Sequence, residues 1–480
     1  VTLTNSELER KVYTLNHIYV PTVKDMLKTN KQWIFIILLV IIAMIIFIKW
    51  REYYYKKLLH TDTLTQIPNK QYFMKTAEKI LDNNSDKSYL LTSLDARNFK
   101  LINERFGHIV GDQTLMNIAK NIKSKFHKNG LYARSQSDSF LILVEDTSQN
   151  RELLKSLVDL DISIHNTTNY KVPLKIGVCP ILRYNPALSL SLYIDRANIA
   201  KKYTSVRNTN YICYFTDDMN KKLNMKNMIE SEMVRALSKG EFVVYYQPKY
   251  EIANDTIIGA EALVRWNHKE KGIISPGVFI PVFERNGFIV DLDFYVYEQV
   301  LKMQKHRLDM GKKVIPISMN VSRCHLSDTN FVDKLEAVVA KYKVPKQYIE
   351  MEITESIFSQ EDSSAIALIY NLKEHGFTIS MDDFGSGYSS LNLLRKVPID
   401  TLKIDKVFID STEDVQRSQV IVEEIINMAS KIHVKTICEG VETQSQRDFL
   451  KIAGCNMVQG YFYSKPLPYE DFSDLLNSSK

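Results

Sequence analysis

Residues 257–266 read IIGAEALVRW, a mainly apolar run that carries Glu261 in its middle and Arg265 near its end. Short apolar runs of this kind predict a buried strand. Seven further segments after residue 240 read in the same way: 243–250, 314–322, 348–356, 377–385, 401–409, 434–442 and 457–465. Helical stretches separate most of them. Eight strands that alternate with helices predict a (β/α)₈ barrel.

Each predicted strand carries a polar residue toward the end at which barrel enzymes hold their active sites. These residues are Gln247, Glu261, Asn320, Glu352, Asp382 with Asp383, Lys403 with Asp405, Glu439 with Glu442, and Gln459. A lone acid of this kind is most often a solvated strand end or part of a salt bridge. Several carboxylates at one barrel mouth, however, repel each other strongly unless cations hold them.

Carboxylate and amide oxygens suit the hard cations Mg²⁺ or Mn²⁺ rather than zinc. Two such cations are suited to phosphodiester hydrolysis, because they polarise phosphoryl oxygens and lower the pKa of a bridging water. Arg265 can meet a phosphate, and Lys403 can orient the attacking water or stabilise developing charge. The barrel residues therefore predict metal-dependent phosphodiester hydrolysis.

At these residues the sequence resembles the EAL-domain cyclic di-GMP phosphodiesterases. The signature stands at Glu261-Ala262-Leu263, among the motifs YQPK (246–249), NVS (320–322), EITES (352–356), DDFGSGYSS (382–390), KID (403–405), EGVET (439–443) and QGY (459–461). The resemblance covers about residues 225–475. It implies a TIM barrel that dimerises, with its first strand antiparallel to the others. It also implies hydrolysis of cyclic di-GMP to linear pGpG with two Mg²⁺ or Mn²⁺ ions.

The resemblance assigns roles to individual residues. The implied metal ligands are Glu261, Asn320, Glu352, Asp382, Asp383 and Glu439, and Glu439 matches a glutamate that is either a metal ligand or the general base. Lys403 is implied to position the attacking water. The implied substrate contacts are Gln247, Arg265 and Gln459. Glu355 is implied to brace the loop after the paired aspartates (384–390), and we count it with Glu261, Lys403 and Glu439 in the catalytic set.

Residues 62–215 alternate helices and strands and resemble the GGDEF domain, which in active members is a diguanylate cyclase with an adenylyl-cyclase-like α/β fold. The resemblance rests on Asp62-Thr-Leu-Thr65, Asn69, Phe99-Lys100, Ile102-Asn103, Phe106-Gly-His108, Gly111-Asp112 and YIDRANIAKK (193–202). The implied guanine-reading residues are Asn103 and Asp112. Asp95 and Asp138 remain as an implied metal pair.

The stretch 133–144, ARSQSDSFLILV, predicts a β-hairpin whose turn contains no glycine. Gln136-Ser137-Asp138-Ser139-Phe140 stands where the family has Gly-Gly-Asp-Glu-Phe. Side chains in place of the two glycines obstruct a close approach of phosphates, and Ser139 replaces a carboxylate that the chemistry needs. The resemblance therefore implies a degenerate, inactive cyclase domain. Two alternatives stay open: it binds GTP without turnover through Asp95, Asn103, Asp112 and Asp138, or it is a structural, dimerising domain that binds nothing.

Residues 33–48, WIFIILLVIIAMIIFI, contain no polar side chain, and a tryptophan lies at each end if Trp50 is included. Such a run predicts one transmembrane helix with interfacial anchors. A buried core helix and a signal peptide are less favoured alternatives, because the run is apolar on all sides and lies far from residue 1. We therefore expect a single-pass protein of the bacterial inner membrane with its catalytic domains in the cytoplasm.

The 480 residues include 62 basic and 56 acidic side chains, a net charge of +6. This excess of positive charge is too small to indicate a nucleic-acid polymer as partner. Five scattered cysteines without C-x-x-C spacing favour free thiols in a reducing compartment. The predicted chain is an α/β multidomain protein that begins at Val1, and we expect its sensor region to be truncated. Its predicted parts are an extracytoplasmic stub of that sensor region (1–31), the transmembrane helix (32–50), a signalling linker (51–61), the degenerate GGDEF domain (62–215), a linker helix (216–237) and the EAL domain (238–480).

The leading functional hypothesis is a membrane-anchored, homodimeric cyclic di-GMP phosphodiesterase regulated by its inactive cyclase domain. A non-enzymatic cyclic di-GMP receptor is the main alternative, and it would be favoured by missing metal ligands, of which none is missing. A bifunctional cyclase and phosphodiesterase comes third.

Overall fold

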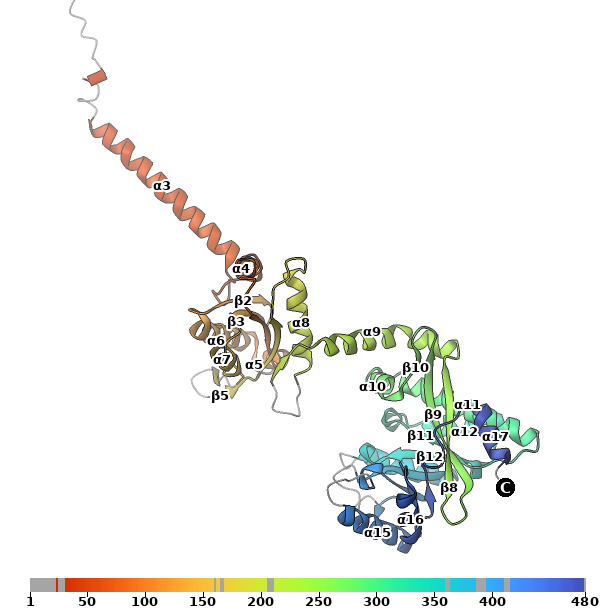
Figure 1. Cartoon of the computed structure of the whole chain (residues 1–480). Coiled ribbons are helices and arrows are strands. Elements are labelled where there is room, and N and C mark those ends of the chain that lie inside the picture. The colour runs from red at the N-terminus through yellow and green to blue at the C-terminus, as the bar shows by residue number, and fades with distance from the viewer. Residues whose placement is uncertain are drawn as a thin grey trace, which may run out of the picture. The chain divides into compact units, whose positions relative to one another are not determined.

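The computed structural model describes residues 23–24, 31–158, 161–164, 168–204, 211–358, 363–385, 394–409 and 415–478. The chain divides into two compact units, Val1–Lys222 and Leu223–Lys480. Most of the predicted stub at 1–31 lies outside the described residues. Each unit is described by itself below (Figure 1).

The first unit is built around a five-stranded sheet in the order β2-β3-β1-β6-β7. Its strands are β1 (Tyr89–Ala96), β2 (Gly130–Gln136), β3 (Ser139–Glu145), β6 (Leu174–Ile181) and β7 (Ile212–Tyr214), and β4 (Asp161–Ile164) pairs separately with β5 (Thr168–Lys171). The helices are α4 (Lys70–Asn83), α5 (Phe99–Phe106), α6 (His108–Phe126), α7 (Ser148–Lys155) and α8 (Leu190–Lys202). The predicted α/β alternation and the hairpin predicted at 133–144 are therefore present.

Alternation along β1 places the two faces of this sheet in different cores. Leu90 and Leu94 pack with residues of α6, whereas Tyr89 and Leu91 pack with residues of α4 and α8. Successive strand residues point to opposite faces, so β1, which carries apolar residues on both faces, is covered by helices on both sides.

The second unit is a barrel of eight strands. Its strands are β8 (Phe242–Glu251), β9 (Thr256–His268), β11 (Ile317–Asn320), β12 (Ile349–Thr354), β13 (Thr378–Phe384), β14 (Thr401–Ile404), β15 (Lys435–Cys438) and β16 (Met457–Val458), with β10 (Gly272–Ile274) added beside β9. β8 pairs with both β9 and β16 and closes the barrel. The predicted barrel and its implied antiparallel first strand are confirmed, because β8 runs antiparallel to both neighbours.

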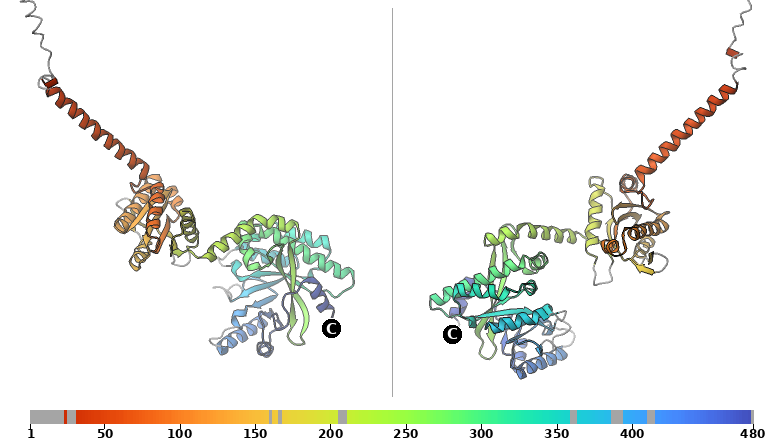
Figure 2. Two further views of the ribbon diagram at one scale, coloured as in Figure 1. Left: turned by 45° about the horizontal axis from the view of Figure 1, so that its top comes forward. Right: turned by 180° about the vertical axis from the view of Figure 1, so that it is seen from behind.

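Helices surround this barrel: α10 (Pro276–Asn286), α11 (Ile289–Asp309), α12 (Phe331–Tyr342), α13 (Ser363–Glu374), α15 (Val415–Lys431), α16 (Gln444–Ile452) and α17 (Tyr469–Ser478). α9 (Asp217–Ser238) precedes the barrel, and its Ile229 and Ala236 pack with Phe242 and Trp266. The hairpin of β8 and β9 is the longest pair of strands, and Figure 2 shows it from two further directions.

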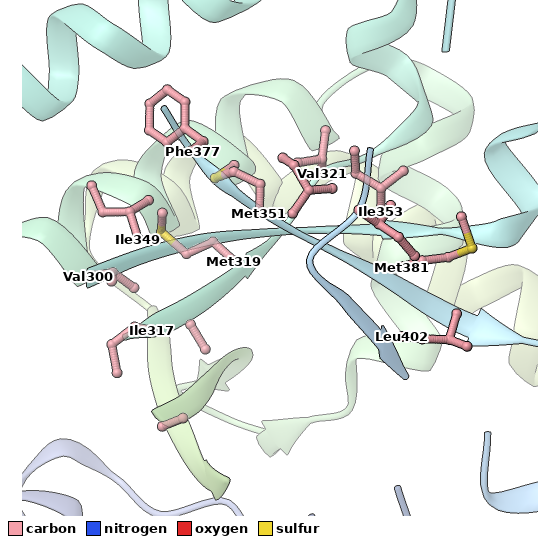
Figure 3. Close-up of a cluster of buried hydrophobic side chains, with 14 of the residues drawn as sticks. Val300, Ile317, Met319, Val321, Ile349, Met351, Ile353, Phe377, Met381 and Leu402 are labelled. Carbon is pink, nitrogen blue, oxygen red and sulfur yellow. The ribbon is translucent and has the colours of Figure 1, made fainter. Parts of the chain in front are cut away.

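The barrel strands alternate between an apolar outer face and a polar inner face. Ile349, Met351 and Ile353 of β12 belong to the large core cluster that includes Val300 of α11 (Figure 3). The intervening Glu350 and Glu352 are buried and contact side chains of other barrel strands. The period of two thus assigns the methionines and isoleucines to the helix layer and the carboxylates to the barrel interior.

The predicted transmembrane helix and membrane localisation are wrong for the structure described. Among the described residues, no helix is both long and apolar enough to cross a bilayer. The apolar run does lie in one helix, α3 (Lys31–His60). Its apolar part extends from residue 33 to residue 48, about 24 Å at 1.5 Å per residue, against a hydrocarbon core of about 30 Å.

Candidate functional site

The predicted site residues of the barrel gather at the C-terminal ends of its parallel strands, which we call the barrel mouth. The strand pairing aligns Gln247 with Glu261 and Asn320 with Glu352. Lys403 lies in β14, and Glu439 and Gln459 directly follow β15 and β16. Parallel strands in register bring residues from distant parts of the chain to the same level, so polar residues of several strands share one rim.

Lys403 is the centre of this group. Its Nζ lies 2.6 Å from Glu439, 3.0 Å from Asp382, 3.1 Å from Glu352 and 3.6 Å from Glu261. The side chain is only 1% exposed. Burial opposes the charged form, but the surrounding carboxylates raise the pKa of Lys403 well above its usual value. The lysine therefore stays an ammonium ion.

The carboxylates respond differently to the same surroundings. Burial raises the pKa of Glu439 to about 8, and repulsion by Asp382 and Glu261 adds to this while Lys403 opposes it. Burial likewise raises the pKa of Glu261. Burial also acts upward on the pKa of Glu352, but attraction by Lys249 and Lys403 holds it down at about 2. The mouth thus combines a firmly ionised carboxylate with others that take up protons unless positive charge is added.

The donor atoms at the mouth fit hard cations. Glu352 Oε2 and Glu439 Oε1 are buried and lack a partner with hydrogen-bond geometry, although both lie near Lys403. Within the described residues, no three His, Cys, Asp or Glu side chains are placed to hold a metal ion as they stand. The carboxylates converge on the Lys403 ammonium instead. Their oxygens are of the type that Mg²⁺ and Mn²⁺ prefer.

The paired aspartates owe their placement to an irregular strand. Adjacent residues of a regular strand face opposite ways, but the register of β13 with β14 shifts between Met381 and Phe384. Asp383 has φ of +56°, a left-handed conformation that a residue other than glycine seldom adopts. Burial raises the pKa of Asp383, and Asp382 is the next cause. Both carboxylates therefore contribute to the same charged region.

Glu355 holds the end of β13. It lies in the 3₁₀ turn η4 (Glu355–Phe358), and its Oε2 accepts a hydrogen bond of 2.9 Å from the backbone N–H of Gly385. Gly385 has φ of +95°, and a Cβ atom there would lie 2.3 Å from the Phe408 ring. The predicted brace thus has a partner in the described residues, whereas residues 386–390 of the loop lie outside them.

Two buried glutamines link the predicted substrate contacts to the acids. Gln459 Nε2 donates to Glu261 Oε2 at 2.6 Å and to Gln247 Oε1 at 3.1 Å. Gln247 Nε2 donates to the carbonyl of Ser464. Arg265 is half-buried, with its guanidinium 5.8 Å from the Tyr245 ring centroid. The side-chain amides of Gln247 and Gln459 thus hold one oxygen of Glu261 in place, and Arg265 adds a positive charge near Glu261.

Sequence reasoning missed a second buried lysine. Lys249 Nζ lies 2.8 Å from Glu352 Oε1 and 3.1 Å from Glu350 Oε2. Lys249 is two residues beyond Gln247 on β8, so the two share a face of the strand. The position of Lys249 two residues after Gln247, within the motif YQPK, was the sequence feature that could have identified it as a residue of the barrel interior.

The GGDEF-like hairpin of the first unit turns through two residues, Ser137 and Asp138, between β2 and β3. Ser137 has φ of +50°, and its carbonyl accepts hydrogen bonds of 2.9 and 2.6 Å from the Arg134 guanidinium. Arg134 also pairs with Asp62 at 3.0 Å. The turn is thus held in a conformation that glycine would adopt without strain.

The four predicted GTP-binding residues fall into two pairs. Burial and the charge of Asp95 raise the pKa of Asp138, so these two acids are neighbours. Asp95 also pairs with Lys201 of α8 at 2.6 Å. Asn103 lies against Gly111, where an added Cβ would come within 1.9 Å of its Oδ1, and the adjoining Asp112 is exposed.

Replacing Ser137 by glycine is expected to stabilise the first unit by about 0.5–1 kcal/mol, because the left-handed conformation costs serine more than glycine. Hydrogen exchange of the slowest β1 and β3 amides in the full chain measures this change. Ser139→Gly, which places glycine at the first residue of β3, is the matched control and is expected to reduce protection. Reduced protection in Ser137→Gly would contradict the assignment of strain to this turn.

Comparison with known proteins agrees with both units. Residues 59–204 match the family model described as "Diguanylate cyclase, GGDEF domain", and residues 230–466 match that of the EAL domain. The chain is 30% identical over 421 residues to the cyclic di-GMP phosphodiesterase PdeR of Escherichia coli, covering 86% of this chain and 62% of that protein. It is 28% identical over 413 residues to the bifunctional diguanylate cyclase/cyclic di-GMP phosphodiesterase MucR of Pseudomonas aeruginosa, covering 85% and 60%.

A solved structure described as the EAL enzyme Bd1971 in its cAMP-bound form superposes with a TM-score of 0.51 at 22% identity, covering 82% of this chain and 95% of that one, and supports the fold alone. The chain spans about 60% of the length of the curated relatives MucR and PdeR. Both domain types occur in one chain and in the order that its motifs predict. The chain therefore contains a domain of the GGDEF family followed by a domain of the EAL family.

Proposed function

We propose that the EAL domain hydrolyses cyclic di-GMP to linear pGpG with the help of two Mg²⁺ or Mn²⁺ ions. The single observation that carries this proposal is the convergence of Glu261, Glu352, Asp382 and Glu439 on Lys403 inside the barrel mouth. A buried acidic cluster around one ammonium is unfavourable unless further positive charge compensates it. The names of the relatives PdeR and MucR favour the same substrate.

The residues that would hold the cations are the six named from the sequence: Glu261, Asn320, Glu352, Asp382, Asp383 and Glu439. The cations would supply an activated water and neutralise charge on the phosphate. The amides of Gln247 and Gln459 bind the substrate beside Glu261, and Arg265 meets a phosphate. Lys403 holds the attacking water in line and stabilises the charge that develops on the phosphoryl oxygens.

Glu439 is suited to accepting a proton. Burial raises the pKa of Glu439 to about 8 when no cation is bound, and a raised carboxylate pKa favours a general base. It is also one of the six residues able to hold a cation. The proposal therefore gives Glu439 one of two roles, cation ligand or general base, as the resemblance implies.

Removal of divalent cations tests this proposal. Treating the full chain with a chelator is expected to reduce hydrolysis of cyclic di-GMP below detection, and excess Mg²⁺ or Mn²⁺ is expected to restore it. The product is measured as pGpG by chromatography. Undiminished turnover at a chelator concentration that removes bound Mn²⁺ would contradict the metal-dependent mechanism.

We propose further that the GGDEF domain is catalytically inactive and regulates the EAL domain, in a homodimer, by binding GTP. The strained Ser137 turn and the serine at position 139 support the inactivity, and the adjoining Asp95 and Asp138 support retained binding. GTP alone is expected to yield no cyclic di-GMP, to bind in calorimetry and to change the rate of cyclic di-GMP hydrolysis. Absence of binding together with an unchanged rate would leave the domain a purely structural role.

A further inference from the structure

Lys249 connects two carboxylates in the barrel interior. It is 3% exposed, and its Nζ lies 2.8 Å from Glu352 Oε1 and 3.1 Å from Glu350 Oε2. Glu350 and Glu352 are two residues apart on β12 and therefore face the same way. Ser380 Oγ of β13 donates to the other oxygen of Glu350, so Glu350 has a partner at each oxygen.

Glu352 differs from Glu350 in how its second oxygen is used. Oε1 accepts a hydrogen bond from Lys249, whereas Oε2 lies 3.1 Å from Lys403 Nζ without hydrogen-bond geometry. The side chain is fully buried, so water does not compete for these contacts. A carboxylate fixed through one oxygen cannot rotate freely, and its other oxygen keeps a constant direction toward the mouth.

We propose that Lys249 is a positioning residue, which anchors Glu352 through Oε1 so that Oε2 is presented to a divalent cation. This inference rests on the proposed function of the barrel mouth. The ion-pair partners of Lys249 are Glu350 and Glu352, so it acts on the mouth through Glu352. The alternative is a purely structural role, in which Lys249 neutralises Glu350 and stabilises the barrel without affecting cation binding at the mouth.

The two alternatives separate when Mn²⁺ alone is titrated into the full chain by calorimetry, without cyclic di-GMP. Lys249→Met keeps the length of the side chain but removes the ammonium, and it is expected to weaken Mn²⁺ binding by about 10- to 100-fold. Hydrolysis is expected to fall with it and to recover in part at high Mn²⁺. Lys249→Arg, which keeps a donor to Glu352, is expected to retain part of the affinity.

The double variant Lys249→Met/Glu350→Gln distinguishes positioning from neutralisation. Removing the second charge spares the barrel an unpaired buried carboxylate, so thermal stability is expected to recover, while Mn²⁺ affinity stays low. Lys346→Met is the matched control, since Lys346 is a part-buried lysine paired with Glu336 outside the mouth. It is expected to leave Mn²⁺ affinity unchanged.

Recovery of Mn²⁺ affinity in the double variant would overturn the proposal, as would unchanged affinity in Lys249→Met. A failure of the proposed function has a different signature. If the unaltered chain binds Mn²⁺ more tightly than Lys249→Met but does not hydrolyse cyclic di-GMP, only the proposed reaction is refuted. An unaltered chain that binds no Mn²⁺ would overturn both.

Discussion

Replacing Lys403 by methionine is expected to lower kcat for cyclic di-GMP hydrolysis by about 10³-fold while Mn²⁺ binding persists. Methionine fills much of the same buried space but carries no charge. The variant therefore loses the group that orients the water and stabilises developing charge. Because the ammonium competes with cations for Glu261, Glu352, Asp382 and Glu439, its removal is not expected to weaken Mn²⁺ affinity.

Steady-state kinetics and Mn²⁺ calorimetry on the same preparation check both halves of this expectation. Lys373→Met is a suitable control, because Lys373 of α13 forms an ion pair with Asp400 in a part-buried position away from the acidic cluster. The control should keep the unaltered kcat. If Lys403→Met retained kcat within about 3-fold, or lost Mn²⁺ binding and activity together, Lys403 would not have the catalytic role assigned to it.

Replacing Glu261 by glutamine is expected to reduce hydrolysis by about 10³-fold, through loss of a charge that a cation requires. Glutamine has nearly the same shape, and its side-chain oxygen can still accept the hydrogen bond from Gln459 Nε2. Binding of cyclic di-GMP should therefore stay within about 10-fold of that of the unaltered chain. This combination separates an enzyme from a receptor.

Calorimetry with cyclic di-GMP and a chromatographic assay of pGpG measure the two properties of Glu261→Gln. Glu442→Gln is the control, because Glu442 is exposed and pairs with Lys406 outside the acidic cluster. It should hydrolyse cyclic di-GMP at the unaltered rate. Near-normal turnover by Glu261→Gln would remove Glu261 from the set of essential residues and with it the metal arrangement proposed here.

The barrel could be predicted because its strands are short apolar runs with polar residues at their ends. The predicted segments were too long where a polar motif follows the strand: 457–465 was expected, whereas β16 is only Met457–Val458. The paired aspartates could be named, but the left-handed conformation of Asp383 could not. It depends on the pairing of β13 with β14, which is a tertiary property.

Lys249 and residues 33–48 illustrate two opposite errors of prediction from sequence, an overlooked residue and an overinterpreted segment. Lys249 was overlooked because a lysine inside a strand reads as a surface residue until its partners on β12 are placed opposite it. The apolar run was interpreted as a membrane span, whereas among the described residues no helix is long and apolar enough to cross a bilayer. In the hairpin, the missing glycines were visible in the sequence, but only the backbone assigns the strain to Ser137.

The most direct test of the central claim is to incubate the full chain with cyclic di-GMP and Mg²⁺ or Mn²⁺, with and without GTP, and to identify the product. Metal-dependent formation of linear pGpG is the result that the acidic cluster around Lys403 predicts. Stable binding of cyclic di-GMP without any pGpG, under every metal and GTP condition and in a dimeric preparation, would contradict it and favour a receptor.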